Sequence, residues 1–257
     1  MDRKWDFYFC HVDDKPASIY VDLHLRDQAP LAALPDRAYL SLVLRQPRPD
    51  GLSSHDEFDA LKAIEDALEE HLASPTTMYV GRNTSDGRRD YWFYVADAAA
   101  WKRQAADFMA RFPDYSHEAE SEPDPAWSAY LEFLYPNEQG WDFITNRQVC
   151  DSLEENGDPL TQAREIEHWA YFPDASSCEV FVARVTALGF EVRESWVTES
   201  AGDEVGVRLV RRDVPSHRDI HDVTVPLLRA ARDAGGRYDG WETQCLPSNE
   251  RRGSPHQ

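Results

Sequence analysis

The sequence predicts an α+β protein with two antiparallel sheets, each carrying helices on one face. Three observations predict this fold. Several segments alternate apolar and polar residues with the period of two that is typical of half-buried strands. Other segments repeat apolar residues every three or four positions, as amphipathic helices do. Strands and helices follow one another in the same order twice along the 257 residues.

Composition and charge limit what the protein can be. The chain has 27 basic and 47 acidic side chains, a net charge of −20, and 42% hydrophobic residues. This apolar content predicts a folded protein, and the acidic excess favours a basic partner over nucleic acid or anionic membranes. Apolar runs are shorter than the roughly 20 residues of a membrane-spanning helix. The N-terminus has carboxylates where a secretion signal needs an apolar core, so we expect a cytoplasmic protein.

The first half begins with a predicted β-hairpin. Residues 17–25 place alternate apolar side chains on one face, and Trp5, Phe7 and Phe9 do the same in the preceding strand. Residues 37–45 predict a third strand, which ends before a proline-rich turn.

A helix is predicted to begin at Ser54. Ser54 and Glu57 have the spacing of a capping box, in which each side chain accepts a backbone N–H at the helix start. The predicted buried stripe consists of Phe58, Leu61, Leu68 and Leu72. Strands at 77–83 and 90–96 follow, and Asp97 is expected to cap a second helix.

From residue 37 the order is strand, helix, strand, strand, helix, strand, which predicts a ferredoxin-like arrangement. Residues 127–135 fit either a strand or a helix, so the sequence leaves the position of the closing strand open. Residues 114–125 hold five acids and no base. We interpret that run as a charged surface segment.

The second half repeats this order after a leading helix. Its predicted elements are a helix at 138–156, a strand at 164–172, a helix from 174, strands at 190–198 and 205–212, a helix at 216–234 and a strand at 237–246. We therefore expect an N-terminal domain at 1–136, a second domain at 137–247 and a mobile tail at 248–257.

One internal similarity suggests that the two halves are structural relatives. Residues 91–97 and 168–174 align without gaps and share a Trp, a Tyr and an Asp before a predicted helix. Two unrelated strand-to-helix junctions would give the same match, and both interpretations stay open.

Sequence motifs argue against catalysis. The chain has no GxSxG, GxxxxGK, strand-following GxGxxG or HExxH motif, and its four cysteines form no CxxC pair. We predict no catalytic, cofactor-binding or metal-binding residue and no enzyme. His217 and His221 lie four residues apart on a predicted helix, so their imidazoles could face one metal ion. A metal-dependent hydrolase is therefore an alternative.

Acidic runs supply candidate partner-binding residues in the first half. Asp56 and Glu57 belong to the first run, and Glu118 and Glu120 to the second. Aligned carboxylates accept bidentate contacts from guanidinium groups, so an arginine-rich segment would suit them. A solvated surface is the other interpretation.

The string YDGWET at 238–243 is the most distinctive one in the second half. An Asp-Gly step inside a strand predicts a β-bulge that redirects its flanking aromatic residues. As structural residues, Trp241 would fill the core and Asp239 would accept loop amides.

Together with the IEHW string at 166–169 and GFEV at 189–192, this string carries a resemblance to a known family. Residues 141–247 resemble the RraB family, regulators of ribonuclease E activity. The resemblance implies a ferredoxin-like α/β sandwich and non-catalytic inhibition by binding the scaffold portion of ribonuclease E. The candidate partner-binding residues of this half are His168, Tyr238, Asp239, Trp241 and Glu242.

The N-terminal half resembles a bacterial domain family of unknown function that is often fused ahead of an RraB-like module. The matching segments are residues 5–8, 49–52 and 127–136. This resemblance implies no activity. We interpret the chain as a non-catalytic regulatory protein that binds a basic protein partner, such as ribonuclease E or another RNA-processing factor. An acidic immunity-type protein is a further alternative.

Overall fold

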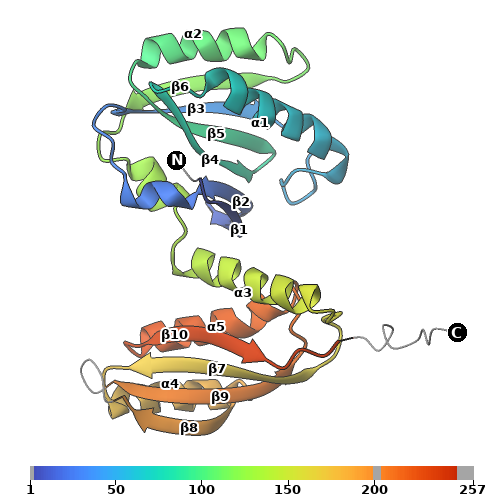
Figure 1. The fold of residues 1–257 in the computed structure, drawn as a ribbon, viewed down its shortest axis with the longest axis vertical. Helices are drawn as coiled ribbons and strands as arrows, with labels where there is room; N and C mark the ends of the chain where they lie inside the picture. The colour runs from blue at the N-terminus through green and yellow to red at the C-terminus, as the bar shows by residue number, and fades with distance from the viewer. Residues whose placement is uncertain (1–2, 199–203, 248–257) are drawn as a thin grey trace, which may run out of the picture. The chain divides into compact units, whose positions relative to one another are not determined.

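The computed structural model describes residues 3–198 and 204–247 and shows an α+β protein with two antiparallel sheets, as predicted (Figure 1). The chain divides into two compact units, and the boundary along the sequence lies between Gly140 and Trp141. Each unit has its own sheet and its own buried apolar cluster. Among the described helices, none combines the length and the apolar character needed to cross a membrane.

Six strands form the N-terminal sheet. In spatial order they are β1 (Trp5–Val12), β2 (Lys15–Asp22), β4 (Thr77–Ser85), β5 (Arg88–Val95), β3 (Asp36–Val43) and β6 (His117–Pro123). Helix α1 (Phe58–Leu72) follows β3, and α2 (Ala98–Met109) follows β5. The order β4-β5-β3-β6 is that of a ferredoxin-like sheet, which confirms the prediction from residue 37 onward. The β1–β2 hairpin extends this sheet beyond β4.

The core of this unit lies between the sheet and its two helices (Figure 1). Alternate residues of β3 point into it, among them Leu40 and Leu42, where they meet Leu68 of α1 and Trp101 of α2. Asp97 caps α2 as predicted, since its carboxylate accepts the backbone N–H of Ala100 at 2.9 Å.

The face predicted for the first strand is right at Trp5, which packs against the core and stacks on Tyr79, but not at Phe9. In β1 the buried side chains are Asp6 and Tyr8, whereas Phe9 is 48% exposed. The Tyr8 hydroxyl donates to the carbonyl of Leu134 at 3.1 Å. Apolar residues occupy both faces of this edge strand, and the face that meets the segment after β6 is the buried one.

The predicted capping box is also wrong. Ser54 makes no side-chain cap, and α1 begins at Phe58, whose side chain is 57% exposed. Both oxygens of Glu57 instead accept the backbone N–H groups of Arg45 and Gln46, each at 2.9 Å. Glu57 thereby ties the start of the helix to the chain after β3, a contact that local spacing does not reveal.

The closing strand of this unit lies within the acidic run at residues 114–125. Residues 117–123 form β6 beside β3, while Ala129–Leu134 is a short π-helical turn rather than a strand. Trp127 stacks on Tyr94 with ring centroids 3.9 Å apart, and the Tyr94 hydroxyl donates to Asp124 at 2.5 Å. This turn is therefore fixed by contacts with β5, which the sequence pattern alone does not show.

Four strands form the C-terminal sheet. In spatial order they are β10 (Arg237–Thr243), β7 (Arg164–Phe172), β9 (Val205–Asp213) and β8 (Glu191–Val197). Helix α3 (Glu138–Glu155) leads into this unit, α4 (Ala175–Ala187) follows β7, and α5 (Ile220–Asp233) follows β9. The element order is again ferredoxin-like, and α4 and α5 lie on one face of the sheet (Figure 1).

The internal similarity has a local cause. Residues 91–97 run from β5 into α2, the second strand–helix unit of the first domain, whereas residues 168–174 run from β7 into α4, the first such unit of its domain. Asp97 and Asp174 each cap the helix that follows. The two domains share a topology, but the aligned segments occupy different positions in it.

Two further predictions concern the helix at 216–234 and the tail. The helix α5 begins at Ile220, four residues later than predicted. Residues 216–219 form a turn that precedes the helix. The tail predicted for residues 248–257 lies outside the described residues.

Candidate functional site

The predicted partner-binding residues do not form one cluster. Asp56, Glu57, Glu118 and Glu120 belong to the N-terminal unit, and the other five to the C-terminal unit. Asp56 is exposed, but Glu57 is only 4% exposed and its two oxygens are occupied as described above. Glu57 is therefore a structural carboxylate.

Glu118 and Glu120 lie on the edge strand β6 with exposed side chains. Each is paired with a base of the same unit, since Arg88 donates to Glu118 at 2.9 Å and Lys102 to Glu120 at 2.7 Å. Exposed ion pairs of this kind contribute little to stability, so breaking one to form a contact with a partner costs little. Both carboxylates are therefore accessible to a basic partner.

His168 lies in the interior of the C-terminal unit. Its side chain is fully buried, its Nδ1 is 2.8 Å from the Tyr238 hydroxyl, and its ring meets Phe190 edge-on. Burial lowers the pKa of His168 to about 3, and the nearby charge of Arg211 lowers it further. Burial also raises the pKa of Tyr238 well above its usual value. Both groups are neutral at pH 7, so this pair is part of the core.

The predicted β-bulge is present in β10. The register with β7 shifts between Tyr238 and Gly240, and Gly240 has φ +115°. Trp241 is buried as predicted, and its Nε1 donates to Asn146 Oδ1 at 2.7 Å. Asp239 pairs with Arg237 of the same strand, so the prediction that it accepts loop amides is wrong.

Glu242 lines a surface groove at the edge between β7 and β10, which we name the carboxylate groove. Its lining residues are Arg164, Glu165, Glu167, Glu242, Thr243, Gln244 and Leu246. Glu165 and Glu167 project from β7, and Glu242 is the cross-strand neighbour of Glu167 on β10. The sequence analysis missed Glu165 and Glu167. Their alternation with the buried Ile166 and His168 is the signal that could have found them.

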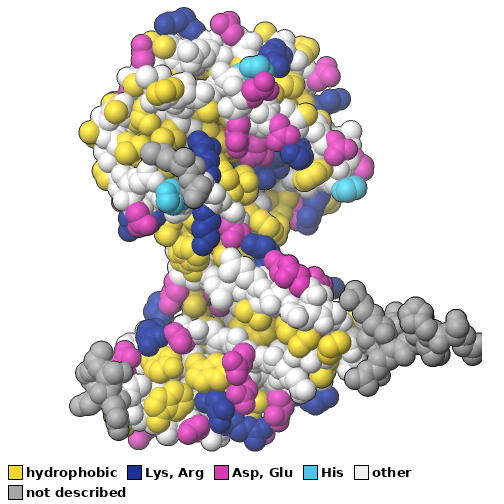
Figure 2. All heavy atoms as spheres, viewed as in Figure 1, with side chains coloured by type: hydrophobic (Ala, Val, Ile, Leu, Met, Phe, Trp, Pro, Cys, Tyr) yellow, Lys and Arg dark blue, Asp and Glu magenta, His cyan; other side chains and the backbone are white. Residues whose placement is uncertain are grey.

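Next to this groove lies a set of partly exposed aromatic side chains, the aromatic face. It consists of Trp169, Tyr171 and Trp196. These residues alternate with core residues, so they lie on the side of the sheet opposite α4 and α5. Tyr171 and Trp196 meet edge-on at 6.0 Å, and the Arg237 guanidinium lies 4.3 Å from the Tyr171 ring centroid. Figure 2 shows hydrophobic side chains beside acidic and basic ones over the C-terminal sheet.

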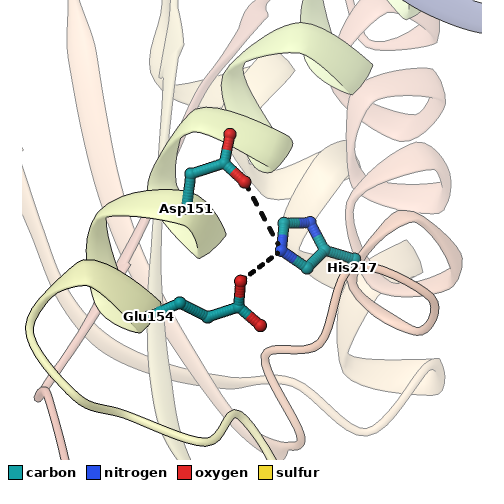
Figure 3. A group of neighbouring side chains, drawn as sticks. All are labelled: Asp151, Glu154 and His217. Carbon is teal, nitrogen blue, oxygen red and sulfur yellow. Dashed lines mark hydrogen bonds and ion pairs between the residues drawn. The ribbon is translucent and has the colours of Figure 1, made fainter.

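The structure separates the two histidines of the alternative metal site. His221 stacks on Phe143 with ring centroids 4.4 Å apart, and its Nδ1 is 3.1 Å from Asn146 Nδ2. His217 instead faces two carboxylates of α3, Asp151 and Glu154 (Figure 3). Because the helix starts only at Ile220, the i, i+4 geometry that would aim both imidazoles at one ion does not exist.

These observations define a protein of two ferredoxin-like domains, whose C-terminal sheet carries an acidic groove beside partly exposed aromatic side chains. The chain belongs to the DUF695 family, a family of unknown function whose model matches residues 3–135. The model of the family described as regulator of ribonuclease activity B, RraB, matches residues 143–243. Both resemblances noted in the sequence are confirmed.

Other comparisons add little. No curated protein matches the chain. A crystal structure of an unknown protein from Galdieria sulphuraria is 12% identical and covers 81% of this chain and 97% of its own, with a TM-score of 0.22. A likeness at that TM-score supports no conclusion about function.

Proposed function

We propose that this protein is a non-catalytic regulator of a ribonuclease and acts by binding a protein partner. The observation that carries the proposal is the RraB match over residues 143–243. It favours a regulator over the metal-dependent hydrolase and over the acidic immunity-type protein. By the same resemblance, the partner we propose is ribonuclease E.

The proposed contact surface is the carboxylate groove together with the aromatic face. Glutamates in the groove can accept guanidinium or ammonium groups, and Trp169 beside them can accept a cation over its ring. The net charge of −20 favours approach of a basic segment. Asp56, Glu118 and Glu120 are proposed as secondary contacts on the N-terminal domain, where they would strengthen the same electrostatic attraction.

Two substitutions test this surface. We expect Glu242→Lys and Trp169→Ala to weaken binding of an arginine-rich ribonuclease E scaffold segment at least tenfold in a calorimetric titration of the full chain. Glu179→Lys is the matched control, because Glu179 is an exposed glutamate on α4 of the same domain. Equal affinity in all three variants would contradict the proposed surface.

The regulatory role has a separate test. We expect the protein to slow RNA cleavage by ribonuclease E and to cleave no RNA by itself. Binding should weaken at least tenfold when salt rises from about 0.05 M to 0.5 M, because screening shortens the reach of surface charges. Absence of binding even at low salt would refute the proposed function.

A further inference from the structure

We propose that Asp151, Glu154 and His217 form a binding site for one divalent transition-metal ion such as zinc. One donor atom from each residue lies within 4.8 Å of the other two. The carboxylates come from α3, and the imidazole comes from the turn before α5 (Figure 3). This site is independent of the proposed partner-binding surface.

Two carboxylate oxygens converge on a single nitrogen. His217 Nε2 is 3.5 Å from Asp151 Oδ1 and 3.3 Å from Glu154 Oε2. One ring N–H makes only one well-directed hydrogen bond, and charged N–H···O bonds close to about 2.7–2.9 Å. Nε2 is within hydrogen-bond distance of Glu154 Oε2, and both contacts are longer than the shortest charged hydrogen bonds, so the three side chains meet at one point with room between their donor atoms.

The two distances from His217 Nε2 are compatible with a metal ion shared by the nitrogen and the carboxylate oxygens. Zinc binds imidazole nitrogen at about 2.0–2.1 Å and carboxylate oxygen at about 2.0–2.2 Å, so a tetrahedral ion separates its donor atoms by about 3.4 Å. The separations of 3.3 and 3.5 Å at His217 Nε2 bracket that value. A nitrogen and two oxygens are donors that zinc and neighbouring first-row ions accept.

Local structure holds the donors in place. Asp151 and Glu154 are three residues apart on α3 and therefore share one face. The His217 turn is closed by the hydrogen bond from Ile220 N to the Ser216 carbonyl at 3.0 Å and by the Ser216 hydroxyl, which contacts Asp219 at 2.7 Å. Such pre-organisation lowers the cost of assembling a metal site.

Arg147 acts on the other side of Asp151. Its guanidinium donates to Asp151 Oδ2 at 2.9 Å and leaves Oδ1 directed at His217. A partner of this kind orients a metal ligand, although its positive charge also reduces the attraction for a cation. The side chains of Asp151, Glu154 and His217 are 43%, 52% and 38% exposed, so the remaining coordination position is open to water.

The test is a zinc titration of the full chain by calorimetry, together with the visible absorption spectrum of bound cobalt. We expect one equivalent of zinc to bind the unmodified protein, and His217→Gln and Glu154→Gln each to weaken it at least tenfold. His71→Gln is the matched control, because His71 Nε2 faces one carboxylate oxygen of Glu70 at 3.8 Å and should leave zinc binding unchanged.

Circular dichroism checks that the variants fold. We expect them to fold, because the substituted side chains are partly exposed. Absence of zinc binding by the unmodified protein would overturn the proposal, and so would zinc binding that survives both His217→Gln and Glu154→Gln. A ¹⁵N spectrum in which the His217 ring is protonated at pH 7 and does not respond to zinc would show an ion pair only, and would overturn it as well.

Discussion

Glu57 lies within an acidic run, and its burial and hydrogen bonds give it a structural role that its neighbours lack. It is buried, and it accepts two backbone N–H groups from the chain after β3. Its neighbour Asp56 is exposed. Sequence spacing treats the two residues alike, whereas only Glu57 accepts backbone N–H groups from a distant segment of the chain.

We therefore expect Glu57→Ala to lower the free energy of unfolding of the N-terminal domain by about 1–3 kcal/mol, because two part-buried backbone N–H groups lose a charged acceptor. Asp56→Ala should change it by less than about 0.5 kcal/mol. Urea unfolding followed by circular dichroism measures both. Equal effects of the two substitutions would contradict the structural role of Glu57.

His168 links stability to pH. In the folded protein its pKa is lowered from 6.5 to about 3, so it stays neutral, whereas in the unfolded chain it takes up a proton below about pH 6.5. Between these two values the unfolded state binds more protons than the folded state. Stability therefore falls as the pH is lowered through this range.

The expected loss is about 1.4 kcal/mol for each pH unit between 6.5 and 3. His168→Gln removes this contribution, so its stability should depend less steeply on pH than that of the unmodified protein. Urea midpoints measured at several pH values from about 7 to 4 give the comparison. Parallel pH profiles for the two proteins would show that His168 is not the titrating group.

At the scale of elements, Asn146 attaches α3 to the rest of the C-terminal domain. Its Oδ1 accepts from Trp241 on β10, while its Nδ2 donates to Asp142 at 2.9 Å and to Thr224 on α5 at 2.8 Å. Asn146 is 1% exposed. One side-chain amide therefore joins two helices and a strand, and it needs both its donor and its acceptor.

Asn146→Asp keeps the shape of the side chain but replaces a donor by a carboxylate next to Asp142. We expect it to lower the free energy of unfolding by about 3 kcal/mol or more, since it buries an unpaired charge. Asn156→Asp, at an exposed position, should cost less than about 1 kcal/mol. Differential scanning calorimetry of both variants measures this contrast, and similar melting temperatures would argue against the network.

For the whole molecule, the two separate cores predict two folding units. Leu68 and Trp101 belong to one buried cluster, and Phe181 and Leu227 to the other. A cut between Pro136 and Asn137 leaves α3 whole, because that helix starts at Glu138.

We expect fragments 3–136 and 137–247 each to fold alone and to unfold cooperatively. The first fragment retains the whole six-stranded sheet and the second the whole four-stranded sheet, each with its helices. Circular dichroism and thermal unfolding of the separate fragments test this. A fragment that lacks a cooperative transition would show that its domain depends on the rest of the chain.

Much of the fold follows from the sequence, because strand alternation and helix spacing are local. The order of elements predicted both ferredoxin-like sheets, Asp97 caps its helix as expected, and the Asp-Gly step marks a real β-bulge. The strings at 166–169 and 238–243 also carried the family resemblance that the RraB model confirms. Each of these features depends on neighbours along the chain.

Tertiary structure decided the features that depend on which surfaces meet. Residues 117–123 became an edge strand because β3 supplies its hydrogen bonds, although their composition suggests a solvated run. His217 left its predicted partner His221 and met Asp151 and Glu154, since the helix begins three residues later than its position. Burial and donor geometry are set by contacts between distant segments, so local periodicity could not determine them.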